Sequence, residues 1–197
     1  LVARNDYILD QPEDYCLSQG FSFHSVSRDP LKSPALKAIR YWEDLRRGRE
    51  ISAEQALFVL KFMSPAGYDA KLLARLKADD ASQMYDMGRL KELGLKVGCI
   101  WHECLLKISP KEKDYFIAAR KRGEPLLKEP RIRISTIHAA KGGEADHVLL
   151  MTDVSYRCYQ NAQENPDDEA RVFYVAATRC RKSLNLILPK TNLNFEL

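Results

Sequence analysis

The stretch that decides the fold class lies in the last third of the chain, at Ser135–Glu144 (STIHAAKGGE). It follows a run in which Ile132 and Ile134 alternate with polar residues, a pattern typical of a strand. A second apolar run, Val148–Met151, comes soon after it. The adjacent glycines let backbone amides approach a phosphate or a sugar closely. Such a connection favours an α/β fold, although taken alone it is structural about as often as functional.

The next informative stretch, Asp168–Lys182, is predicted to be a helix. Its acidic residues come first and its basic residues last, which suits the helix dipole. Helical spacing places four polar residues along one side: Arg171, Tyr174, Thr178 and Arg179. An arginine projecting there can stabilise charge on a transferring phosphoryl group. For Arg179 in isolation, a surface arginine with an ion-pair partner is the simpler interpretation. A final strand is expected at Leu184–Leu188.

Both ends of the chain have an α/β sequence pattern, whereas the middle has a helical pattern. Leu1–Ala3 is predicted to be a strand and Tyr7–Gln19 a helix. From Pro30 the pattern is helical, with capped starts at Ser33 and Ser52. We therefore predict one discontinuous α/β domain, residues 1–29 and 128–197, interrupted by an all-helical insertion at residues 30–127.

Composition excludes several classes of protein. The chain has 197 residues and a net charge of +4, which is too mild to indicate nucleic-acid binding. Its five cysteines are odd in number and irregularly spaced, so we expect no disulfide framework and a reducing, cytoplasmic setting. No apolar stretch is long enough to span a bilayer. Because the chain begins with Leu1 in a strand pattern, we expect it to be an excised piece of a longer protein.

Two candidate sites are set aside. The cluster Cys99-Ile-Trp-His102-Glu-Cys104 lacks a second ligand pair, so buried structural cysteines are expected and no metal site. The phosphate-binding loop pattern G-x-x-x-x-G-K-[ST] does not occur, and Asp153 is interpreted as an ordinary strand-end aspartate. The chain is therefore not expected to hold ATP and Mg²⁺ by itself.

Two segments together resemble a known family. Thr136–Glu144 resembles motif V of superfamily 1 DNA helicases of the UvrD/Rep/PcrA type, and Glu169–Arg179 resembles their motif VI. Leu1–Asn5 is similar to a strand motif of the same family. Departures include Gly143, where leucine is usual, and Asp6, where asparagine is usual. The resemblance implies a RecA-like (P-loop NTPase-like) parallel sheet with helices on both faces, namely motor domain 2A with a short insertion resembling 2B.

The resemblance also implies roles for individual residues. Arg179 would be the arginine finger, with Gly142 and Glu144 beside it on the ATP-binding side. Thr136, His138 and Arg4 would face single-stranded DNA. The motif VI residues Arg171, Tyr174 and Thr178 would couple the two sides.

The expected function is that of the C-terminal motor half of an ATP-dependent DNA helicase that moves 3′→5′ in repair or replication. ATP and Mg²⁺ would bind with help from upstream domains 1A and 1B, and both single-stranded and duplex DNA would be partners. The isolated fragment would be a monomer without ATPase activity. The alternative is a non-catalytic module that binds DNA or protein. The run Lys107–Arg133, with nine basic and four acidic residues, would suit that alternative or would simply be a solvated face.

Overall fold

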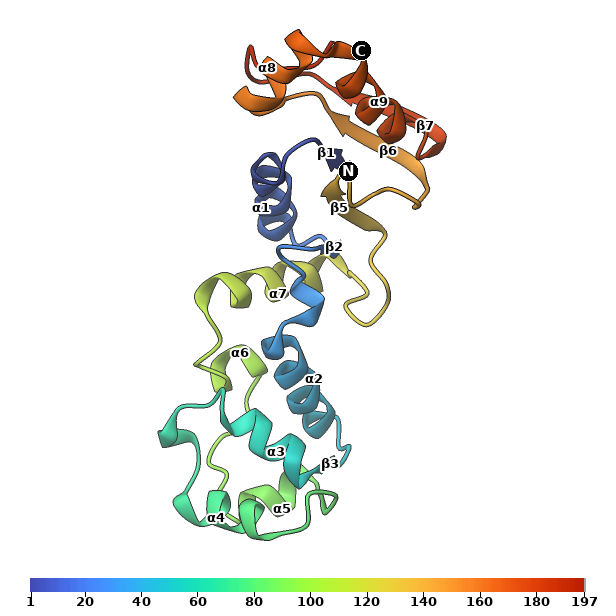
Figure 1. The fold of residues 1–197 in the computed structure, drawn as a ribbon. Helices are drawn as coiled ribbons and strands as arrows, with labels where there is room; N and C mark the ends of the chain where they lie inside the picture. Colours follow the sequence, from blue (N-terminus) through green and yellow to red (C-terminus); the bar gives the residue numbers. More distant parts are fainter. Residues whose placement is uncertain (197) are drawn as a thin grey trace. The chain divides into compact units, whose positions relative to one another are not determined.

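A five-stranded parallel sheet is the centre of the first of two units that make up the protein (Figure 1). The computed structural model describes residues 1–196. Unit 1 comprises Leu1–Asp29 together with the chain from Lys121 onward, and unit 2 comprises Pro30–Arg120. The two units are described separately below.

The sheet of unit 1 has the strand order β2-β5-β1-β6-β7, and all neighbouring strands are parallel. Its strands are β1 (Val2–Ala3), β2 (Phe23–Ser25), β5 (Ile132–Thr136), β6 (Ala145–Met151) and β7 (Cys180–Ile187). The first strand of the chain thus lies in the middle of the sheet, between β5 and β6, which lie in the last third of the chain. The α/β, RecA-like parallel sheet predicted from the sequence is confirmed.

Helices cover both faces of this sheet. They are η1 (Asp6–Leu9), α1 (Asp10–Gln19), α8 (Tyr156–Glu164) and α9 (Pro166–Ala177). Successive strand residues point to opposite faces. Accordingly, Val2 and Leu150 pack in one apolar cluster with Phe173 of α9. Ala3 and Met151 pack in another with Leu9, Cys16 of α1 and Phe23. Two cores on opposite faces of one sheet result, as in doubly wound folds.

Unit 2 is mainly helical but not entirely. Its helices are η2 (Pro30–Lys32), α2 (Pro34–Arg46), α3 (Ala53–Leu60), η3 (Pro65–Gly67), α4 (Ala70–Ala78), α5 (Met87–Glu92), α6 (Trp101–Cys104) and α7 (Pro110–Arg122), whose last two residues belong to unit 1. A short antiparallel pair, β3 (Ile51–Ser52) with β4 (Met84–Tyr85), was not predicted. The all-helical description is therefore wrong at this pair. The likeness of this segment to 2B stays a prediction.

Local sequence signals explain the helices that begin unit 2. The Ser33 hydroxyl accepts a hydrogen bond from Ala35 N, and Pro34 occupies the first turn of α2. At α3, Ser52 and Gln55 form both hydrogen bonds of a capping box. The apolar positions predicted at three-residue spacing in α2 are buried: Leu36, Ile39, Trp42 and Leu45.

One helix boundary differs from the prediction. The helix expected to run to Lys182 ends at Ala177, and β7 starts at Cys180. The reason is pairing with β6, where Ala145 lies opposite Cys180. The amide of Ala145 donates to the carbonyl of Arg179 at 2.9 Å. Arg179 therefore lies in the turn after α9 instead of on the helix.

The cysteines also differ from expectation. Cys99 is exposed, Cys104 is buried, and the two are joined by a disulfide with a Cα–Cα distance of 6.2 Å. The burial expected for both cysteines holds for Cys104 but is wrong for Cys99, and the disulfide was not expected; the short segment between them brings their Cα atoms within bonding reach. Cys16, Cys158 and Cys180 are free.

Candidate functional site

The amino-terminal edge of the sheet brings two distant segments together at Arg179. The Arg179 guanidinium donates to the carbonyl oxygens of Val175 (3.0 Å) and Gly143 (3.4 Å) and to the hydroxyl of Thr178 (3.3 Å). Arg179 thus lies over the last carbonyls of α9, where the helix dipole favours a cation. All three acceptors are neutral, so the arginine charge is not neutralised by any of them.

The loop facing Arg179 is exposed over Lys141–Glu144. Gly142 has φ +84°, a conformation that residues with a side chain rarely adopt. Gly143 has ordinary backbone angles, and its amide donates to Ala140 O at 3.0 Å. This turn leaves backbone and the side chain of Glu144 open to solvent next to an unneutralised guanidinium. An anionic ligand could be bound there by backbone amides and by Arg179 together.

At the opposite, carboxyl-terminal edge, Arg4 follows β1 directly and meets Glu169 of α9. Its Nε donates to Glu169 Oε1 at 2.5 Å and its Nη2 to Oε2 at 3.3 Å. The Glu169 side chain is 6% exposed and the Arg4 side chain 20%. Hydrogen bonding to this carboxylate raises the pKa of Arg4. Arg4, predicted to face DNA, is thus occupied on two of its nitrogens by an internal partner, and its DNA contact stays a prediction.

Glu169 is the site residue that sequence reasoning missed. It lies on the same face of α9 as the buried Phe173 and Ala176. A carboxylate on a buried helix face requires a cationic or hydrogen-bonding partner. That spacing was the available signal, but no sequence pattern pairs Glu169 with a residue 165 positions away.

Thr136 and His138 lie at this same carboxyl-terminal edge. Thr136 is paired with Ala3, the residue before Arg4, and the amide of Ile137 donates to Ala3 O at 2.9 Å. The Thr136 hydroxyl accepts from the amide of Ala139, which tightens the turn after β5. In this turn Ile137 is buried and His138 is exposed. The sheet therefore gathers Arg4, Thr136 and His138 at one edge.

Asn5 holds that edge to the segment after β6. Its side-chain oxygen accepts from the amide of Ser155 at 2.8 Å, and its side-chain nitrogen donates to Cys158 Sγ at 3.6 Å. The Ser155 hydroxyl in turn caps α8 through the amide of Cys158. The end of β1 is thus fixed by side-chain contacts on α8 as well as α9.

One helix, α9, links the two edges. Glu169 near its start contacts Arg4, and Arg179 just past its end contacts Gly143. At about 1.5 Å per residue, the eight-residue rise from Glu169 to the helix end at Ala177 is about 12 Å. Of the predicted coupling residues, Thr178 contacts Arg179, whereas Arg171 and Tyr174 are exposed and Arg171 pairs only with Asp168 at 3.1 Å within the described chain. A rigid element therefore joins the edges, through Glu169 and Thr178.

The strand-end residue Asp153 serves the fold. It is buried, and Oδ1 accepts from the amides of Lys190 (3.1 Å) and Thr191 (3.0 Å) and from the Thr191 hydroxyl (2.9 Å). It therefore anchors the segment that follows β7. Within residues 1–196, no group of three or more histidine, cysteine or acidic residues is arranged to hold a metal ion. No helix of the same residues is long and apolar enough to cross a membrane.

Part of the chain matches a family model. Residues 116–191 match the family described as the UvrD-like helicase C-terminal domain. This range contains β5, the Gly142–Gly143 turn, α9 and Arg179, so it includes residues of both sheet edges. No curated protein and no solved structure matches the chain.

Proposed function

We propose that the chain is the C-terminal motor half, domain 2A with a short 2B insertion, of an ATP-dependent DNA helicase that translocates 3′→5′, since residues 116–191 match the UvrD-like helicase C-terminal domain. The observation that supports this most directly is the contact between Arg179 and Gly143. Two segments 36 residues apart meet at one sheet edge and place a cation over a glycine turn. DNA interaction follows from the helicase domain in general terms, and the roles below are the proposal.

On the nucleotide side, ATP binds between the Arg179 edge and a second RecA-like domain, 1A, which carries the phosphate loop and the carboxylate for Mg²⁺. The residues present fit an anionic ligand, since the guanidinium hydrogen bonds only to neutral acceptors among the described residues. Arg179 stabilises charge that develops on the γ-phosphate. Gly142 and Glu144 contact the remainder of the nucleotide. When bound, ATP supplies the free energy for movement.

On the DNA side, Thr136 and His138 contact one strand from the exposed turn after β5. A hydroxyl and an imidazole are suited to phosphate and sugar contacts, which position a strand without reading its sequence. Arg4 lies beside them on the end of β1. Its charge is shared with Glu169, so its contribution depends on the position of α9.

Coupling between the sides runs through α9 in this proposal. A shift of Arg179 on nucleotide binding moves a helix whose other end contacts Arg4 through Glu169. Thr178 transmits that shift because its hydroxyl accepts from Arg179. Arg171 and Tyr174, which are exposed on α9, contact the neighbouring domain.

The experiment uses the protein in which this chain is joined to its phosphate-loop domain. We expect DNA-stimulated ATP hydrolysis, together with displacement of streptavidin from the 5′ end of a biotinylated oligonucleotide and not from the 3′ end. Displacement only from the 3′ end would contradict 3′→5′ movement but would still agree with a translocating motor. Absence of ATP hydrolysis in a folded protein that still binds DNA would overturn the proposal that this chain is half of a motor.

The second candidate, a non-catalytic DNA- or protein-binding module, is suited by one observation: the run Lys107–Arg133 carries nine basic and four acidic residues. The same hydrolysis measurement separates the two functions. A module would bind DNA with an affinity that ATP does not alter, whereas a motor half changes its DNA affinity when the nucleotide cleft closes.

A further inference from the structure

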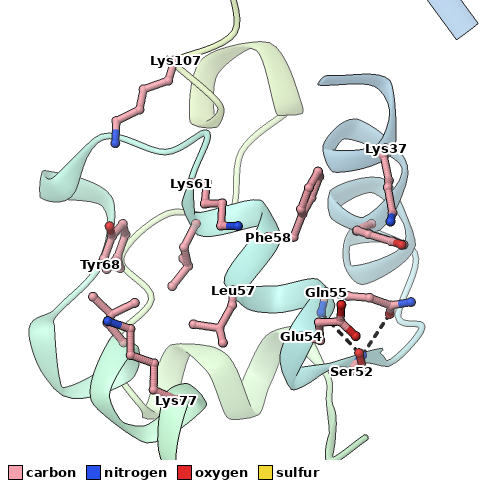
Figure 2. Close-up of a pocket in the computed structure, with 13 residues that line it drawn as sticks. Lys37, Ser52, Glu54, Gln55, Leu57, Phe58, Lys61, Tyr68, Lys77 and Lys107 are labelled. Carbon is pink, nitrogen blue, oxygen red and sulfur yellow. Dashed lines mark hydrogen bonds between the residues drawn. The ribbon is translucent and has the colours of Figure 1, made fainter. Parts of the chain in front are cut away.

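A second candidate site lies within unit 2. It is an open pocket of about 540 Å³ lined by α2, α3 and α4 and by Ser52, Tyr68 and Lys107 from segments between helices (Figure 2). Its wall carries four lysines: Lys37, Lys61, Lys77 and Lys107. Three aromatic residues complete it: Tyr41, Phe58 and Tyr68. The volume lies within the range of pockets that enclose a small molecule or one segment of a flexible chain.

The charge of this pocket is strongly unbalanced. Against the four lysines stands a single acid, Glu54. All four lysines are exposed, and none forms an ion pair within residues 1–196. Other basic residues of unit 2 do find acidic partners, as in the pair of Lys96 with Asp69 at 2.5 Å. Like charges gathered around one concave surface repel each other, and an anion bound there removes that repulsion.

The rings give the same pocket flat apolar walls. Tyr41, Phe58 and Tyr68 are each half-buried, so their backbones and ring edges are fixed by packing. Tyr41 and Phe58 meet edge to face, with centroids 6.2 Å apart. The ammonium groups of Lys37 and Lys61 lie 5.3 and 5.7 Å from the Phe58 centroid. Cations and rings therefore occur side by side, not on separate patches.

From this combination we propose that the pocket binds a single strand of nucleic acid, with phosphates on the lysines and a base against the rings. Alternating cations and aromatic faces bind single strands without sequence preference, because every base has a π face and every linkage a charge. A duplex is recognised by elements that protrude into its grooves, which a pocket does not offer. An acidic peptide would neutralise the lysines but would leave three rings without planar partners.

Glu54 and Gln55 give the pocket a polar end. The Gln55 side-chain oxygen is used by the capping box, accepting from Ser52 N, which leaves its amide nitrogen as a donor (Figure 2). The Glu54 carboxylate repels phosphate and accepts hydrogen bonds from exocyclic amines of bases. A base that carries an exocyclic amine can therefore donate to Glu54 while the phosphates contact the lysines. This site is separate from the motor function proposed above and does not rest on it.

The first experiment identifies where the strand lies. An oligothymidylate carrying 5-iododeoxyuridine is photocrosslinked to the whole chain, and the modified tryptic peptides are sequenced by mass spectrometry. We expect crosslinks at Tyr41, Phe58 or Tyr68, in addition to any in unit 1. Crosslinks confined to residues 1–29 and 121–196 would overturn the proposal that the pocket binds a single strand. They would leave the DNA contacts proposed for unit 1 unaffected.

The second experiment compares two charge-matched triple variants by fluorescence anisotropy with labelled oligothymidylate. The pocket variant is Lys37→Gln with Lys61→Gln and Lys107→Gln. The control is Lys71→Gln with Lys91→Gln and Lys111→Gln, exposed lysines of unit 2 outside the pocket. We expect the pocket variant to bind about 10-fold more weakly, with a salt slope reduced by about 2, and the control to change less than about 2-fold. Equal effects of both triples would overturn the proposal.

The third comparison separates nucleic acid from an acidic peptide. Tyr68→Leu keeps an apolar side chain but removes the ring, and we expect it to weaken oligothymidylate binding by about 5-fold or more. Binding of an abasic oligonucleotide, which has phosphates but no bases, should be unchanged. If polyglutamate displaces the oligonucleotide at equal charge concentration and Tyr68→Leu changes neither ligand, the pocket takes an acidic peptide and the proposal is wrong. Circular dichroism checks that each variant is folded.

Discussion

The carboxylate of Glu169 binds the guanidinium of Arg4 through two hydrogen bonds and thereby joins the first strand of the chain to α9, 165 residues later. This pair lies at the carboxyl-terminal edge of the sheet, whereas the contact of Arg179 with Gly143 lies at the amino-terminal edge. One helix therefore begins at one candidate site and ends at the other. In the proposed function this helix is the route of coupling, and its contact with Arg4 can be tested in the isolated chain.

Removing the Glu169 carboxylate should destabilise the protein strongly. Glu169→Ala leaves the largely buried Arg4 guanidinium without its partner, and we expect a loss of about 3 kcal/mol in the free energy of unfolding. The matched control is Asp168→Ala, which removes the neighbouring carboxylate from an exposed pair with Arg171 and should cost less than about 0.5 kcal/mol. Urea unfolding followed by circular dichroism measures both. Equal losses would show that the Arg4–Glu169 pair does not join β1 to α9 energetically.

The turn beside Arg179 depends on the backbone of one glycine. Gly142→Ala forces a side chain into a φ of +84° and should cost about 1 kcal/mol, although open space surrounds the new methyl group. Gly143→Ala has no such strain; its added carbon would lie 3.4 Å from Ala140 O and should cost less than half as much. Thermal unfolding of the two variants distinguishes them. A larger loss for Gly143→Ala would mean that close packing, not backbone angle, shapes this turn.

Asp153 should stabilise the fold by accepting hydrogen bonds from the segment after β7. In Asp153→Ala, the amides of Lys190 and Thr191 lose their partner in a partly buried position, and we expect a loss of about 2 kcal/mol. Asp153→Asn retains one acceptor oxygen and should lose about half of that. Chemical denaturation gives both values. If Asp153→Ala were as stable as the unchanged chain, the segment after β7 would be held by other contacts.

We expect the contribution of Asp146 to the stability of the chain to depend on pH. A hydrogen bond from Lys182 and the nearby Arg181 lower its pKa. A carboxylate with a lowered folded pKa stabilises the folded chain above its unfolded pKa, and this contribution is lost as the pH falls through the folded value. Asp146→Asn should therefore be less stable than the unchanged chain at pH 7, and the two should converge by about pH 2. A difference that persisted unchanged at low pH would exclude the charge as its source.

The features that could be predicted from sequence are local ones. Alternation at Ile132 and Ile134 placed β5, and cap residues at Ser33 and Ser52 placed α2 and α3, because both signals act within a few residues. The glycine pair before β6 was recognised for the same reason. These signals were sufficient for the fold class, since strands and helices of these lengths assemble in few ways.

The features that were missed depend on distant residues. The end of α9 was predicted five residues too late because pairing of Cys180 with Ala145 is not visible in a helical pattern. The short strand at Ile51 forms only because Tyr85 lies opposite it. The partnership of Arg4 with Glu169 likewise needs the whole sheet to be in place. In each case tertiary contacts override or complete a local preference.

The measurement that tests the central claim most directly is DNA-stimulated ATP hydrolysis by Arg179→Ala, in the protein that joins this chain to its phosphate-loop domain. The matched control is Arg181→Ala, which removes an exposed arginine two residues later that pairs with Asp146. We predict that Arg179→Ala lowers the turnover number by about 10³-fold or more without loss of folding, and that Arg181→Ala changes it by less than about 3-fold. Full hydrolysis by a folded Arg179→Ala protein would contradict the claim that this edge of the sheet completes an ATP site.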